Sequence, residues 1–215
     1  MSKKKVLKRV IAITIAVLLV GLVVWYFVQK NGVRRAIPGI GEPVQEETTG
    51  NTTKTVDGYN VTITYKYTYE IEALVVHTKA YDGSSFADKM SPLDAALAWG
   101  KVAQYNKKID FNWSQSGRWY SWHVDDVSVL APVGGTSYVN EHSANTHLLP
   151  SSSTIKDKVK KIRRGDHIRL KGYLVDVDAE KSNGETYWWH SSTTRTDTGD
   201  GACEVMYVTD VEWLD

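Results

Sequence analysis

The sequence predicts a mainly β domain, of the β-rich α+β class, exported behind one N-terminal transmembrane helix. Two features of the chain carry this prediction. Residues 61–72 alternate strictly between apolar or aromatic and polar side chains, and residues 10–28 contain no charged side chain. A period of two is typical of a strand with one buried face, whereas an uncharged apolar run of this length is typical of a membrane-spanning helix.

The apolar run is long enough to cross a bilayer. Its 19 residues, 10–28, span roughly 28 Å as a helix, close to the thickness of the hydrocarbon layer. Five bases precede the run and three follow it, which predicts a cytoplasmic N-terminus of residues 1–9 in the inner membrane and an exported remainder. A cleaved signal peptide is the alternative, but the run exceeds the about 7–15 residues of a signal core and no small-residue cleavage site follows.

The formal net charge of +1 is the sum of two unlike parts. Residues 1–35 carry eight of the 26 bases and none of the 25 acids, which leaves 18 bases against 25 acids, or −7, in the remaining 180 residues. An acidic exported domain argues against nucleic acid as a partner. The single cysteine excludes a disulfide framework, and His142 with His147 has no identifiable third ligand, so no metal or other cofactor is predicted.

The composition divides the chain after the membrane segment. Residues 29–57 are rich in glycine and threonine and predict a flexible tether, and residues 58–215 predict the folded domain, with a sub-boundary near 132–150. Ser91 followed by Pro92 predicts the start of a short helix that ends at Gly100. Further strands are predicted at 118–130, 166–177, 185–190 and 203–213.

The C-terminal third has a second distinguishing pattern. Residues 169–177 alternate poorly, which is typical of a strand that is buried on both sides or strongly curved. Asn183 and Gly184 form a turn signal between this strand and the next. We therefore expect a small closed barrel resembling the oligonucleotide-binding type in this part of the chain.

Residues 191–203 concentrate hydroxyl side chains, glycines, two acids, one arginine and the only cysteine. In a catalytic interpretation, Ser192 or Cys203 is the nucleophile, a histidine such as His147 is the base, and Asp197 orients that histidine. In a structural interpretation the same residue types build a long ordered turn, because their side chains bond local amide groups. The pattern is compatible with both interpretations.

Aromatic side chains are the other candidate binding groups. Seven tryptophans follow the membrane segment, and Trp119, Trp122 and Trp188 lie in clusters of neighbouring rings. With Arg195 they are the predicted binding residues for a glycan or an envelope protein. Tryptophans also form the core of β domains that contain few phenylalanines, and this chain has three.

Several segments are similar to a group of uncharacterised bacterial single-pass membrane proteins. The similarity lies in residues 91–94, 98–100, 118–120, 143–148, 172–175 and 191–199. It implies a location in the bacterial envelope and brings no known activity. The sequence thus leaves two hypotheses: a non-catalytic envelope protein that binds a protein or glycan, and a membrane-tethered hydrolase that uses residues 191–203 with a histidine.

Overall fold

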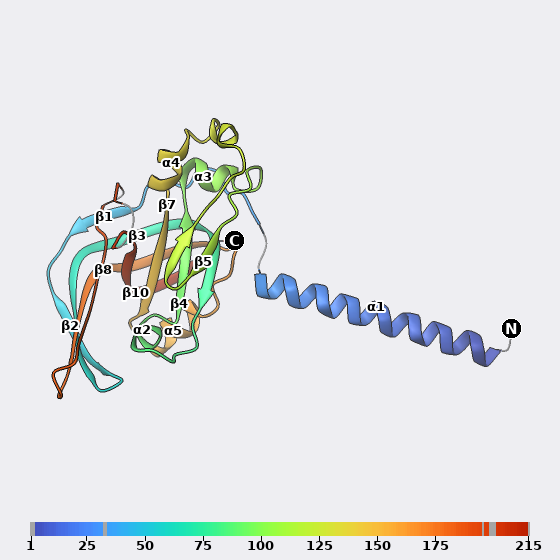
Figure 1. Ribbon diagram of the computed structural model, residues 1–215, viewed down its shortest axis with the longest axis horizontal. Helices are drawn as coiled ribbons and strands as arrows, with labels where there is room; N and C mark the ends of the chain where they lie inside the picture. Colours follow the sequence, from blue (N-terminus) through green and yellow to red (C-terminus); the bar gives the residue numbers. More distant parts are fainter. Residues whose placement is uncertain (1–2, 32–33, 195, 198–200, 215) are drawn as a thin grey trace. The chain divides into compact units, whose positions relative to one another are not determined.

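The computed structural model describes residues 3–31, 34–194, 196–197 and 201–214 (Figure 1). The chain divides into two compact units, Met1–Val33 and Arg34–Asp215. The first unit contains the single helix α1, Lys3–Asn31. Residues 9–26 of this helix have a mean hydropathy of 2.3 and none of them is buried. Helix α1 is therefore long and apolar enough to cross a membrane.

The second unit is β-rich, as predicted. Its strands are β1 (Val44–Glu47), β2 (Asn51–Val56), β3 (Tyr59–Ala80), β4 (Leu93–Ala98), β5 (Ser114–Ser116), β6 (Trp119–Ser121), β7 (Ser143–Pro150), β8 (His167–Lys181), β9 (Thr186–His190) and β10 (Glu204–Trp213). Its helices are short: α2 (Phe86–Met90), α3 (Gly100–Tyr105), the 3₁₀ helix η1 (Val127–Leu130), α4 (Thr136–Glu141) and α5 (Ser153–Val159).

Five strands pair into a closed ring. Strand β3 pairs with β4, β4 with β7, β7 with β10, β10 with β8, and β8 with β3 again. The pairing of β7 with β10 is parallel and the other four are antiparallel. Strand β3 can close the ring because it is 22 residues long and passes two irregular points, after Tyr65 and after Val75. The ring draws on residues 59–213 and is not confined to the C-terminal third.

The two faces of the ring differ in polarity. One row of register partners is apolar and buried: Leu93, Leu148, Met206 and Leu174. Asp94 is adjacent to Leu93 in β4, and His147 is adjacent to Leu148 in β7. Asp94 and His147 are also register partners, and their side chains point to the opposite face of the sheet. The interior of such a small ring is filled by its own side chains. The apolar row therefore faces inward, and the polar row faces outward.

Two predictions about residues 91–130 are wrong. The helix predicted from Ser91 is instead strand β4, because its apolar run is buried on every residue between β3 and β7. Ser91 follows the last residue of α2 and does not begin a helix. The strand predicted over residues 118–130 is limited to β6, which pairs with β5, and is followed by η1.

Residues 34–57 of the predicted flexible tether belong to the folded unit. Residues 44–56 form β1 and β2, and both strands pair with β3. Their side chains are exposed or half-buried, so the sequence lacks the apolar pattern of a buried strand. The folded unit already includes Arg34, so the boundary lies well before residue 57. No division occurs near residues 132–150, where β7 is a central strand of the ring.

Candidate functional site

The β5–β6 hairpin covers the outer face of β4 and β7 and delivers Arg118 to it. Gly117 and Arg118 form the two-residue turn, with φ of 57° and 75°. Left-handed backbone at both central positions is typical of a type I′ hairpin, although an arginine rarely occupies it. The strain at Arg118 is offset by its contacts, because its guanidinium lies 2.7 Å from Asp94 and 2.6 Å from Asp88.

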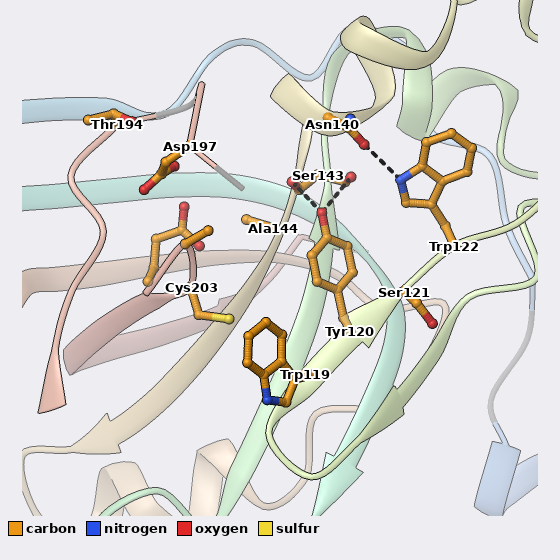
Figure 2. A pocket seen from close by; sticks show the side chains of 12 residues that line it. Trp119, Tyr120, Ser121, Trp122, Asn140, Ser143, Ala144, Thr194, Asp197 and Cys203 are labelled. Carbon is orange, nitrogen blue, oxygen red and sulfur yellow. Dashed lines mark hydrogen bonds between the residues drawn. The ribbon is translucent and has the colours of Figure 1, made fainter. Parts of the chain in front are cut away.

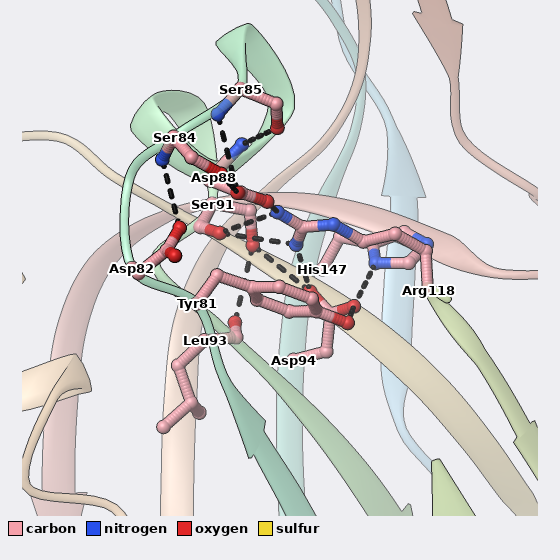
Figure 3. A network of polar contacts seen from close by, with 10 residues as sticks. All are labelled: Tyr81, Asp82, Ser84, Ser85, Asp88, Ser91, Leu93, Asp94, Arg118 and His147. Atoms are coloured by element: carbon pink, nitrogen blue, oxygen red, sulfur yellow. Dashed lines mark hydrogen bonds and ion pairs between the residues drawn. The ribbon is translucent and has the colours of Figure 1, made fainter. Parts of the chain in front are cut away.

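Asp94 is the centre of this buried network (Figure 3). Its side chain is completely buried and accepts hydrogen bonds from Tyr81 Oη at 2.9 Å and Ser91 Oγ at 3.1 Å, in addition to the contact with Arg118. His147 Nδ1 lies 3.0 Å from Asp94 Oδ2. Burial raises the pKa of Tyr81 far above its usual range, and Asp94 adds to the shift, so Tyr81 stays a donor. The network fixes the hairpin on the ring.

A second chain of hydrogen bonds leads from the hairpin to the cysteine. His77 Nδ1 lies 2.9 Å from Gln115 Oε1, and Gln115 Nε2 donates to Asn145 Oδ1 at 2.6 Å. Asn145 Nδ2 then contacts the carbonyl of Arg118 at 2.9 Å and Cys203 Sγ at 3.6 Å. Asn145 therefore connects the turn of the hairpin to Cys203, the residue that precedes β10.

A cavity of about 280 Å³ opens where β7 and β10 begin (Figure 2). It is lined by Trp119, Tyr120, Ser121, Trp122, Asn140, Ser143, Ala144, Thr194, Asp197, Ala202, Cys203 and Glu204. Trp122 Nε1 donates to Asn140 Oδ1 at 3.0 Å, and Tyr120 Oη donates to the carbonyl of Ser143 at 3.1 Å. Trp119 is 49% exposed. The cavity combines flat aromatic rings on one side with polar side chains on the other.

A second cavity of about 220 Å³ shares two residues with the first, Trp119 and Cys203. Its other lining residues are Arg118, His147, Trp188, Trp189, His190 and Gly201. The ring of His147 packs against Trp189, with centroids 4.4 Å apart, and Trp188 is 71% exposed. The two cavities are adjacent in that Trp119 and Cys203 line both, and we call the pair the tryptophan cleft.

The predicted binding residues fall on this cleft. Trp119 borders both cavities, Trp122 lines the first, and Trp188 lines the second. Arg195 lies outside the described residues. These tryptophans were predicted from their clustering in the sequence alone. The structure brings together Trp119 in β6 and Trp188 in β9, which are far apart in the sequence.

Ser192 lies in a turn. Its side chain is buried, and Ser192 Oγ lies 2.7 Å from Asp197 Oδ2 and accepts a hydrogen bond from the amide of Thr194 at 3.2 Å. Within the described part of the chain, no histidine contacts either Ser192 or Asp197 through a hydrogen bond. These contacts are those of an ordered turn.

Cys203 is not an activated thiol. Its pKa is raised to about 11, mainly by burial, partly opposed by the hydrogen bond from Asn145, and further raised by the neighbouring carboxyl groups of Glu204, Asp94 and Asp197. At pH 7 such a thiol is ionised in about one molecule in 10,000, and the thiolate is the nucleophile. His147 lines the same cavity, but among the described residues no hydrogen bond joins its ring to Cys203.

Sequence reasoning missed Asp94, Arg118 and Asn145. Asp94 was assigned to a helix, which hid its place opposite His147 on a neighbouring strand. The spacing of Asn145 and His147 was the available signal, because residues two apart on a strand share a face. His142 instead stacks on Tyr138 and does not join His147.

Comparisons with models of protein families, with curated proteins and with solved structures find no match for this chain. The resemblance to bacterial membrane proteins in several sequence segments stays an expectation. Function must therefore be inferred from the chemistry of the tryptophan cleft and from the character of helix α1.

Proposed function

We propose that the chain is a membrane-anchored, non-catalytic binding protein of the bacterial envelope and that its exported domain binds a glycan in the tryptophan cleft. Helix α1 supports the anchor, because residues 9–26 are long and apolar enough to span a bilayer. The bases before this segment favour a cytoplasmic N-terminus in the inner membrane, with the folded unit outside.

The order of strands in the ring supports a barrel of the oligonucleotide-binding type. Numbered along the chain, the ring strands β3, β4, β7, β8 and β10 follow the spatial order 1-2-3-5-4. Barrels of this type bind oligonucleotides or oligosaccharides on the face of strands 2 and 3, between the loops that join strands 1 to 2 and 4 to 5. The tryptophan cleft takes His147 from strand 3 and Trp188 from the connection between strands 4 and 5.

The side chains of the cleft favour a sugar over a nucleic acid. Asp197 and Glu204 line the first cavity, where acidic groups disfavour phosphates. Exposed indole rings such as Trp119 provide flat apolar surface, and Asn140 and Thr194 provide amide and hydroxyl groups for hydrogen bonds to a polyol. The observation that carries the proposal is the position of Trp119, half exposed between two cavities.

The alternative function is a membrane-tethered hydrolase that uses residues 191–203 with a histidine. One observation favours it: His147 is held 3.0 Å from Asp94 and lines the same cavity as Cys203. The raised pKa of Cys203 and the turn contacts of Ser192 weigh against it. We therefore place the binding function first.

A glycan array probed with the full-length chain in detergent tests the binding proposal. We expect neutral oligosaccharides to bind and oligogalacturonates, which are anionic, to bind at least ten times more weakly. Trp119→Ala should reduce the affinity at least tenfold, because it removes the ring that both cavities share. Trp213→Ala is the matched control, since Trp213 lies at the end of β10 away from the cleft.

Two results would contradict the proposal. If no oligosaccharide binds, the ligand is not a glycan. If the Trp119→Ala and unmodified chains bind with equal affinity, the tryptophan cleft is not the binding site. Covalent labelling of Cys203 or Ser192 by an electrophilic acyl probe in the native chain alone would favour the hydrolase.

A further inference from the structure

Basic side chains lie on two surface turns near the point at which the chain enters the folded unit. Arg34 and Arg35 are the first residues of this unit. Arg34 Nε donates to the carbonyl of Asn106 at 2.6 Å, and Arg34 also donates to the carbonyl of Ile109. Arg35 Nη1 donates to the carbonyl of Gly165 at 3.3 Å. Arg34 and Arg35, which we call the entry point, therefore contact two surface turns that are far apart in the sequence.

Both turns carry exposed bases, which we call the entry patch: Lys107, Lys108, Lys160, Lys161 and Arg163. Among the described residues, none of the five forms an ion pair with a carboxylate. Lysines elsewhere on the unit do form such pairs, as Lys66 does with Asp176 and Lys158 with Asp210. Within the described part of the chain, these two turns therefore carry five bases without an ion pair, although the net charge of the domain is negative.

Trp213 adds an aromatic ring to the entry patch. Its Nε1 donates to Asp166 Oδ2 at 2.9 Å, and the same oxygen accepts the amide of Arg163 at 2.9 Å. Trp213 is 36% exposed. Tryptophan is enriched at the level of lipid headgroups, where one part of the ring is apolar and the N–H remains hydrated.

We infer that the entry patch binds the anionic headgroups of phospholipids. This inference rests on the membrane anchor of the proposed function. Only residues 32 and 33 separate α1 from Arg34 in the sequence, so the short connection limits how far the entry point can lie from an inserted α1. Lysine and arginine clusters that adjoin a membrane segment are attracted to acidic lipids, and the attraction decays over a Debye length. Contact of the patch with lipid restricts the orientation of the exported domain.

Covalent footprinting of lysines tests the inference on the full-length chain. The chain is reconstituted into nanodiscs of phosphatidylcholine alone or of phosphatidylcholine with phosphatidylglycerol, and its lysines are acetylated and quantified by mass spectrometry. We expect acetylation of Lys107, Lys108, Lys160 and Lys161 to be at least threefold slower with phosphatidylglycerol, and the difference to disappear in 0.5 M salt (about a 4 Å Debye length). Lys181, at the far end of β8, should react equally in both lipids.

A triple variant supplies the second arm of the experiment. Lys160→Gln, Lys161→Gln and Arg163→Gln together should also speed the acetylation of Lys107 in phosphatidylglycerol discs, because they weaken attraction of the whole patch. Equal acetylation rates in the two lipids would overturn the inference, as would a lipid effect that the triple variant leaves unchanged. A chain that does not elute with the discs would instead refute the membrane anchor.

Discussion

Replacing Asp94 by asparagine removes the charge at the centre of the buried network and keeps the size of the side chain. Asp94 is completely buried and lies 2.7 Å from Arg118 and 3.0 Å from His147. Breaking a buried ion pair by neutralising one partner costs about 3–5 kcal/mol, because the other charge is left uncompensated. Arg118 keeps its contact with Asp88 at 2.6 Å, so we expect the lower end of this range.

The expected loss of about 3 kcal/mol corresponds to a fall of roughly 6–12 °C in the midpoint of thermal unfolding for a domain of this size. Tryptophan fluorescence of the full-length chain in mild detergent measures this midpoint. Asp210→Asn is the matched control, because its ion pair with Lys158 is half exposed and should contribute less than about 1 kcal/mol. Equal shifts for Asp94→Asn and Asp210→Asn would refute the assignment of Asp94 as the centre of the network.

Two further predictions concern the backbone of β8 and the thiol. Gly172→Ala should destabilise the domain by at least about 3 kcal/mol in urea unfolding, because an added Cβ would lie 2.0 Å from the carbonyl oxygen of Tyr207. Gly184→Ala is the control and should cost about 1 kcal/mol, because Gly184 has a positive φ but open space around it. Similar losses of stability in the two variants would contradict the close contact at Gly172. The rate of Cys203 alkylation should rise with pH, with a midpoint near 11 in the folded chain and about 8.5 in urea. The stability that the neutral thiol contributes to the folded chain is therefore lost as the pH rises between these two values. A midpoint below pH 8 in the folded chain would contradict the burial of Cys203.

Local sequence patterns were sufficient for the elements with one dominant signal. The alternation in residues 61–72 predicted the strand that became β3, and the uncharged run predicted α1. Residues 93–98 show where such patterns fail, because a short apolar run fits a buried helix and a buried strand equally. Its partners β3 and β7 decide the outcome, and both are distant in the sequence.

The tryptophan cleft was predictable in its parts and not in its arrangement. Clustering pointed to Trp119 and Trp188, and the composition of residues 191–203 pointed to Cys203. The network beneath them depends on the register of β4 against β7 and on a left-handed turn at Arg118, which is 24 residues from Asp94. Neither feature has a local signal, because an arginine in this turn conformation is rare.

Protease accessibility in intact spheroplasts tests most directly whether the folded unit is held outside the inner membrane by α1. If α1 anchors the chain in this way, externally added protease should digest the domain of residues 34–215 and leave a small membrane-bound fragment that contains α1. A full-length chain that resists external protease in intact spheroplasts and is digested only after their lysis would contradict it.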